Sequence, residues 1–145
     1  MKKRFFIMFI ILSMTSAVFA AEADKYIADL DPAKDENTII KAADWCGDKQ
    51  EKDAAGKLVS LLSDSRDMVR LHAVMALGFI GKEDYIDAIN NVILNDKNAH
   101  VRYTALLSSL KIRSDKSIPV WKKAKETETD PAMKDLLHVM VRHVA

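Results

Sequence analysis

The sequence predicts an all-α protein built as a stack of helical repeats, and three observations support this fold class. The chain of 145 residues contains only 4 glycines and 3 prolines, and its β-branched residues do not alternate with polar ones. The sequence resembles itself at an offset of 32 residues. Within each copy the matching apolar positions are spaced i, i+4, i+7, i+8 and i+11, which places them on one face of an α-helix.

The first twenty residues have the pattern of a secretory signal peptide. A basic start, Met1-Lys2-Lys3-Arg4, precedes a nearly continuous apolar run over residues 5–14, and Val18 and Ala20 occupy the positions that a signal peptidase reads. We therefore expect residues 1–20 to be cleaved and residues 21–145 to form one periplasmic or secreted domain. The alternative is an uncleaved membrane anchor, for which the apolar run is short. No later segment is expected to cross a membrane.

The predicted helices at the start of the domain cover residues 22–29, 35–46 and 52–63. The short first helix can cover the end of the stack with Tyr26, Ile27 and Leu30. The second carries an apolar stripe and is expected to end at Gly47. The third aligns with residues 84–95, after a turn about two residues longer than in the later copies. The apolar stripe of the second helix consists of Ile39, Ala42, Ala43 and Cys46.

The clearest repeats follow, with helices predicted over 67–80, 84–95, 99–112, 116–126 and 131–144. Helix 67–80 should end at Gly81, because glycine readily adopts the left-handed conformation that closes many helices. The last helix should begin after Asp130-Pro131. The residues in register are Val69, Val101 and Met133; Ala73, Ala105 and Leu137; Ala76, Ser108 and Met140; Leu77, Ser109 and Val141; Ile80, Ile112 and Val144; Ile86 and Ile118; and Ile89 and Trp121.

The terminal helix at 131–144 is expected to leave part of its apolar surface uncovered. Met133, Leu137, Val141 and Val144 are expected to face the preceding repeat, whereas Leu136 and Met140 fall toward a flank that no further helix covers. This helix should therefore be either an attachment surface, through self-association of residues 131–144, or the weakest unit of the stack.

Charged residues follow the same period as the apolar ones. Three acidic residues each lie six positions before a basic residue, and an acidic side chain in the turn can accept hydrogen bonds from the free N–H groups of the next helix. It can also pair with the basic residue of its own or a neighbouring repeat. The sequence thus predicts a structural ladder formed by Asp64, Arg70, Asp96, Arg102, Glu128 and Lys134.

These residues resemble a known family. The stretch 66–81, Arg-Asp-Met-Val-Arg-Leu-His-Ala-Val-Met-Ala-Leu-Gly-Phe-Ile-Gly, is similar to the first helix of a HEAT-like repeat, of the short kind also found in phycobilisome lyases. Residues 117–121 resemble the opening of its second helix, with Pro119 in the family's proline position. The resemblance implies a short right-handed α-solenoid of about three helical hairpins plus a terminal helix. It also implies protein binding or scaffolding, and it transfers no catalytic residues.

The third unit departs from the family pattern. Ser109, Lys111, Arg113 and Lys125 replace the usual leucine, glycine or apolar residues. Its core should therefore be thinner and its surface more basic. The six cations of this region are either a solvated lysine-rich face or a docking patch for an acidic protein partner. They are Lys111, Arg113, Lys116, Lys122, Lys123 and Lys125.

Several kinds of chemistry are not expected. Cys46 is the only cysteine, so no intramolecular disulfide and no thiolate zinc site can form, and we expect a small buried side chain there. The four histidines do not share a helix face at metal-binding spacing, and no nucleophile motif or phosphate-binding glycine loop is present. No catalytic residue, metal or cofactor is predicted. Residues 21–145 hold 19 basic and 21 acidic residues, a balance that disfavours nucleic acid as a partner.

The sequence therefore predicts an exported, non-catalytic module that binds or scaffolds another protein. Solenoids often present the second helices of their hairpins as an extended binding surface. The alternative is an inhibitor or immunity protein that blocks a toxin or a cell-wall enzyme. The candidate binding residues on the second-helix face are Lys57, Asp87, Asn90, Asn91, Lys122 and Lys123.

Overall fold

A computed structural model describes residue 18 and residues 20–143. Most of the predicted signal peptide, and the end of the predicted last helix, lie outside the described residues. Within them the chain is helical and contains no strand, which confirms the all-α fold class. A first helix covers residues 20–29. The elements that follow are α2 (Glu36–Asp48), η1 (Lys52–Ala54), α3 (Ala55–Leu61), α4 (Asp67–Ile80), η2 (Glu83–Tyr85), α5 (Ile86–Asn95), α6 (Ala99–Ile112), η3 (Asp115–Ser117), α7 (Ile118–Thr127) and α8 (Pro131–His143).

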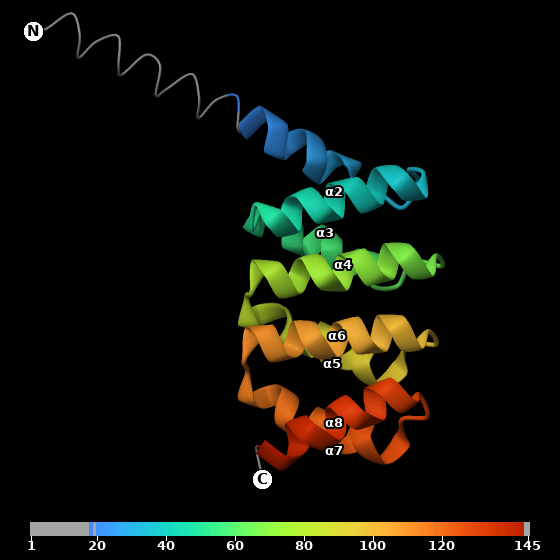
Figure 1. The fold of residues 1–145 in the computed structure, drawn as a ribbon. Coiled ribbons are helices and arrows are strands. Elements are labelled where there is room, and N and C mark those ends of the chain that lie inside the picture. The colour runs from blue at the N-terminus through green and yellow to red at the C-terminus, as the bar shows by residue number, and fades with distance from the viewer. Residues whose placement is uncertain (1–17, 19, 144–145) are drawn as a thin grey trace, which may run out of the picture.

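The helices form two layers of a short solenoid (Figure 1). Helices α2, α4, α6 and α8 lie one below the other and run in the same direction, and we call them the first helices. Helices α3, α5 and α7 lie behind them and are called the second helices. The described helices include none that is long and apolar enough to cross a membrane.

Local sequence accounts for where several helices begin and end. The side chain of Asp35 accepts a hydrogen bond from the backbone N–H of Thr38 at the start of α2, and Asn98 does the same for His100 at the start of α6. Gly81 closes α4 in the left-handed conformation with φ 71°, as predicted. Arg113 occupies the equivalent position after α6 with φ 59°, although it is not glycine.

The end of α2 and the starts of the second helices differ from the prediction. Gly47 does not end α2, which continues to Asp48 before Gln50 takes the left-handed conformation with φ 51°. Gly47 instead packs against Ala76 of α4, so its missing side chain serves helix contact. The second helices each open with a short 3₁₀ turn, the first of which is anchored by a hydrogen bond from the backbone N–H of Asp53 to the Glu51 side chain. This tightening delays the start of each α-helix.

The core lies between the two layers and runs without a break along the stack. Cys46 is fully buried in it, and the aromatic rings of Tyr26 and Trp45 stack at 4.6 Å beside the first repeat. The largest completely buried side chains include six that the sequence pattern places on the inner faces, Ile39, Leu77, Ile86, Ile89, Met133 and Leu137. Four more, which the pattern did not single out, are Leu58, Leu61, Ile93 and Leu106.

The terminal helix differs in part from the expectation. Met133 and Leu137 are buried as predicted, but Met140, expected on an open flank, is also buried. Helix α8 packs mainly on α7, so that Met140 faces inward and Val139 is the large apolar residue that α8 leaves exposed.

Candidate protein-binding surfaces

Arg70 joins two neighbouring repeats from a nearly buried position. Its Nε donates to Asp96 Oδ2 at 2.7 Å and its Nη2 to Asp96 Oδ1 at 3.0 Å, the two-point geometry that suits a guanidinium and a carboxylate. The same side chain also donates to Asp67 Oδ1 at 2.6 Å and to the carbonyl of Asp64 at 2.8 Å. The Asp96 and Asp67 carboxylates together raise the pKa of Arg70.

Arg102 repeats this arrangement one unit further along. Its Nε and Nη2 donate to the two carboxylate oxygens of Glu128 at 2.8 and 2.7 Å, and its Nη1 donates to the carbonyl of Asp96 at 2.9 Å. The backbone N–H groups of Thr129 and Asp130 also donate to Glu128. These hydrogen bonds, that of Arg102 foremost, outweigh the effect of burial and lower the pKa of Glu128 to about 2.

The other two ladder candidates lie elsewhere. The carboxylate of Asp64 pairs with Arg66 at 2.7 Å, and this bond is the main reason for its lowered pKa. Arg66 also donates to the carbonyls of Lys34 and Pro32, so it ties the turn before α4 to the turn before α2. Lys134 is exposed, and among the described ion pairs none involves its ammonium group. Arg70 and Arg102 therefore each pair with the carboxylate of the following repeat, whereas Arg66 pairs within its own turn.

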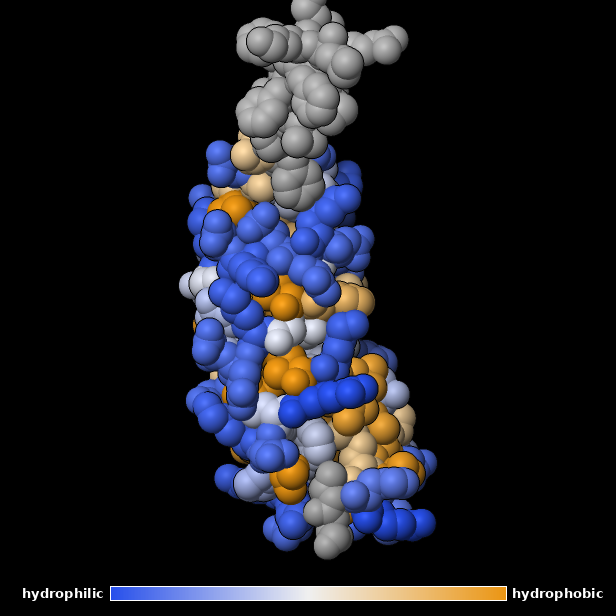
Figure 2. Space-filling model, turned by 90° about the vertical axis from the view of Figure 1, so that its left-hand side faces the viewer, coloured by the Kyte–Doolittle hydropathy of each residue, from blue (hydrophilic) through white to orange (hydrophobic). Residues whose placement is uncertain are grey.

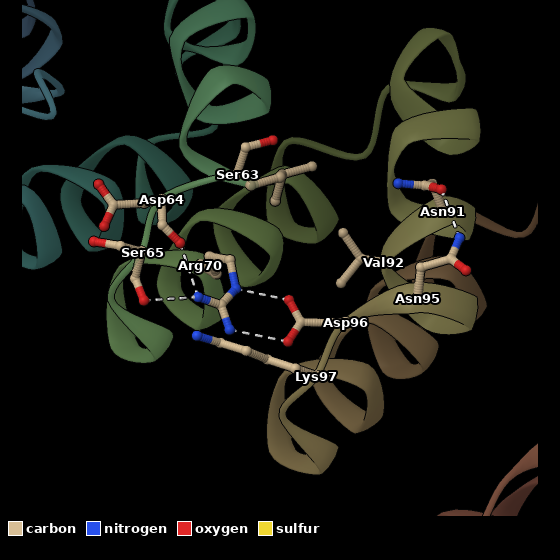
Figure 3. A pocket seen from close by; sticks show the side chains of 10 residues that line it. Ser63, Asp64, Ser65, Arg70, Asn91, Val92, Asn95, Asp96 and Lys97 are labelled. Atoms are coloured by element: carbon tan, nitrogen blue, oxygen red, sulfur yellow. Dashed lines mark hydrogen bonds and ion pairs between the residues drawn. The ribbon is translucent and has the colours of Figure 1, made fainter.

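A polar hollow of about 370 Å³ surrounds the Arg70–Asp96 pair (Figure 3). Figure 3 shows the Arg70 guanidinium directed at Asp96, while Asn95 donates to Asn91 at 2.7 Å on the opposite side. Because Arg70 already donates to oxygens of the protein itself, its guanidinium joins the repeats and is not free for a ligand. The other cation of the lining is the exposed Lys97, whose ammonium lies 3.7 Å from Asp67.

The candidate residues of the second-helix face are not equally available. Asn90 is buried: its Oδ1 accepts from the Ser117 hydroxyl at 2.8 Å, and its Nδ2 donates to the Lys116 carbonyl. The prediction that Asn90 belongs to a binding surface is therefore wrong, because its amide joins α5 to the following turn. Lys57 donates to the carbonyl of Ile27 at 2.8 Å and so connects α3 to the N-terminal helix at residues 20–29.

The remaining candidates of this face are exposed. Asp87 lies 3.8 Å from the ammonium of Lys116, and Asn91 accepts from Asn95. Lys122 and Lys123 project from α7. The second-helix face is thus polar, and four of its six candidates make contacts within the protein.

Large apolar side chains are exposed on the first helices. Figure 2 shows an apolar patch in the lower half of the molecule, on the side where the first helices lie. Sequence reasoning missed this surface, although one signal was present: Met75, Leu107 and Val139 are spaced by 32 residues, on the outer side of their helices. The exposed large apolar residues toward the ends of α4, α6 and α8 are Phe79, Leu107, Leu110 and Val139, and we call them the apolar patch. Met68 is also exposed, but it lies at the start of α4.

A groove of about 640 Å³ lies between the end of α6 and the start of α7, and Leu107 and Leu110 of the apolar patch form part of its lining. Trp121 is held in place there because its indole N–H donates to the Ser109 hydroxyl at 2.9 Å, and Ser109 in turn donates to the Leu106 carbonyl. The residues that line the groove are Leu107, Leu110, Lys111, Arg113, Ser114, Asp115, Ile118 and Trp121.

The cysteine thiol and the histidine rings are the side chains to consider for reactivity or metal binding. Burial raises the pKa of the Cys46 thiol to about 11, which keeps it protonated and poorly reactive at neutral pH. The His72 ring lies 2.6 Å from Asp44 and joins α4 to α2. Among the residues that the structure describes, no group of three or more histidine, cysteine, aspartate or glutamate side chains is arranged to hold a metal ion.

Two layers of parallel helices, joined by repeated arginine–carboxylate pairs, define a helical-repeat protein. The HEAT repeats family matches residues 24–108 and, in a second overlapping alignment, residues 58–138. The chain therefore belongs to the HEAT-repeat family, as the resemblance in the sequence implied. HEAT repeats indicate a protein-interaction scaffold. The comparison with curated proteins gives no match.

Proposed function

We propose that the chain is an exported, non-catalytic module that binds a partner protein through the apolar patch of its first helices. The observation that carries this proposal is the exposure of Phe79, Leu107, Leu110 and Val139 on one face. Contiguous exposed apolar surface favours protein contact, because covering it removes apolar area from water.

The second-helix face supports binding less well. Lys57 and Asn90 already satisfy groups of the protein itself, and Lys122 and Lys123 are flexible, hydrated side chains. Long charged side chains of this kind are depleted in the centres of protein interfaces, whereas aromatic and large apolar residues are enriched there. We therefore place the contact on the first helices.

Export is supported by the basic start, the apolar run and the small residues Val18 and Ala20. The expected location is the periplasm or the extracellular medium. Mass spectrometry of the protein recovered from the cell envelope should find a mature chain that begins at Ala21. An intact Met1 start would contradict cleavage and favour the anchor.

Photo-cross-linking in cells tests the binding face. A photoreactive amino acid replaces Leu107 in one variant and Lys122 in the other, and we expect protein cross-links from position 107 and none from position 122. Cross-links from position 122 alone would return the contact to the second-helix face. If neither position gives a protein cross-link, the binding proposal fails.

The identity of the cross-linked protein then separates the two roles. An envelope component that keeps its activity when bound would make the chain a scaffold. A toxin or cell-wall enzyme that loses activity would make it an inhibitor or immunity protein.

Analytical ultracentrifugation of the mature chain tests the further expectation that residues 131–144 support self-association, for which Val139 is the exposed apolar group.

A further inference from the structure

The junctions between neighbouring first helices are not alike. A Cβ on Gly47 would lie 3.0 Å from the Cα of Ala76, and one on Gly78 would lie 2.5 Å from the Ser108 hydroxyl. The pairs α2–α4 and α4–α6 therefore touch through small residues, and their backbones approach closely. These two junctions leave no room for a larger side chain at the glycines.

The junction between α6 and α8 lacks these small residues. In the 32-residue register, Leu110 takes the place of Gly78 and Met140 takes the place of Ser108. Two bulky residues thus stand where the previous junction has two small ones, and α8 packs mainly on α7. Figure 1 shows α8 tilted relative to α6, so that the two helices diverge toward the end of α6.

At this junction α7 exposes part of an apolar surface whose counterpart on α5 is buried. Ile86 of α5 is completely buried, whereas its counterpart Ile118 is only half-buried. Beside Ile118 lies Trp121, and Leu107 and Leu110 are each 42% exposed along the edge. The result is an apolar groove whose shape is set before any partner arrives, because Ser109 holds the indole of Trp121.

Two of the three charged side chains that line the groove are basic, and the lining Ser114 donates to the Glu83 carboxylate at 2.6 Å. The ammonium of Lys111 lies 4.5 Å from the centre of the Phe79 ring, and Arg113 projects from the left-handed position that closes α6. Among the described residues no carboxylate pairs with Arg113, and Asp115 is the acidic residue of the lining. Residues 97–145 as a whole hold 10 basic and 5 acidic residues.

We infer that this groove binds an acidic amphipathic segment of the partner protein. Large aliphatic or aromatic side chains of the segment lie on Trp121 and Ile118, and flanking carboxylates face Lys111 and Arg113. The inference rests on the proposed function and specifies the chemistry of the partner. A second copy of the chain fits this groove less well. The acidic part of the chain, residues 21–69, holds 12 acidic and 7 basic residues, but Met68 is the large apolar side chain that it exposes among the described residues.

The test selects peptides from a displayed library of random sequences on the mature protein and measures their affinity as synthetic peptides. We expect the enriched peptides to combine acidic residues with large apolar ones. Binding should change the fluorescence of Trp121 in a Trp45→Phe background, because Trp121 forms the floor of the groove. Leu110→Glu, at a half-exposed position, should abolish binding while the circular dichroism spectrum stays unchanged.

Charge reversal provides the matched control. Lys111→Glu with Arg113→Asp should weaken peptide binding about tenfold or more, since two ion pairs are replaced by repulsion. Lys122→Glu with Lys123→Glu changes the net charge equally and should leave the affinity within about twofold. Equal weakening by both double variants would show a general charge effect and overturn the inference.

Other results also overturn it. These are enrichment of basic or purely polar peptides, failure to enrich any peptide, and a dimer of the mature protein that Leu110→Glu dissolves. If any of these results occurs while position 107 still gives protein cross-links in cells, the proposed function stands. Only the proposal that the groove binds an acidic segment then fails. Loss of the cross-links with peptide binding intact would contradict the proposed function alone.

Discussion

Replacing Glu128 by glutamine removes one negative charge from a nearly buried site and changes little else. The carboxylate is 3% exposed and accepts from Arg102 at 2.7 and 2.8 Å and from the backbone N–H groups of Thr129 and Asp130. Glutamine has almost the same shape, but one of its two terminal groups is a donor that faces the donors of Arg102. The variant should therefore be less stable at neutral pH.

The magnitude follows from the lowered pKa. Folding shifts the pKa of Glu128 from 4.5 to about 2, and each pKa unit corresponds to about 1.4 kcal/mol. The charged form thus contributes about 3 kcal/mol to the free energy of unfolding near neutral pH. Because the folded pKa is the lower one, the unfolded chain takes up the proton first, and this contribution is lost as the pH falls from 4.5 toward about 2.

Urea denaturation over a pH series measures this difference. Wild type should exceed Glu128→Gln by about 3 kcal/mol near neutral pH, and the gap should close through the acid range. Glu126, exposed in the last turn of α7 two residues before Glu128, is the matched control, and Glu126→Gln should change stability by less than about 0.5 kcal/mol. A gap that is absent, or that stays constant down to the lowest pH, would refute the account of the Arg102–Glu128 pair.

Three further predictions concern the packing of the repeats. Arg70→Ala leaves the Asp96 carboxylate buried without its cation and should cost about 3–5 kcal/mol in urea denaturation, against at most about 0.5 kcal/mol for Lys122→Ala; equal costs would contradict the ladder. Gly78→Ala should destabilise by about 1–3 kcal/mol because its Cβ meets Ser108, whereas Gly56→Ala, with open space around it, should stabilise by about 0.4–1 kcal/mol. Hydrogen exchange should be faster in residues 131–143 than in 67–80, since α8 packs mainly on α7 while α4 packs between α2 and α6; equal protection would show that α8 is fully secured.

The local pattern of the sequence was sufficient to predict the helices. Apolar residues at helical spacing identify each inner face, and the 32-residue offset identifies the units that stack. Gly81 marks the end of α4 because its left-handed backbone is a local property. Gly47 has the same sequence appearance but lies inside α2, since its role depends on Ala76, a residue of another helix.

The partners of the charged residues depended on tertiary structure. Asp64 and Asp96 stand at equivalent positions, and the sequence alone left open whether Arg70 pairs within its own repeat or with a neighbour. The stacking distance decides: it brings Asp96 to the guanidinium of Arg70, while Arg66 takes Asp64. Asn90 was misassigned for a related reason, because the turn that buries its amide belongs to the next hairpin.

The sequence by itself determined that this chain is a helical repeat with a basic third unit, because these properties follow from periodicity and composition. Tertiary structure decided which surface is left for a partner. Leu110 and Met140 look like ordinary apolar members of the repeat, and their importance appears only because they occupy the places at which Gly78 and Ser108 close the previous junction. The separation of two helices depends on the pair of side chains between them, and each helix supplies only one of that pair.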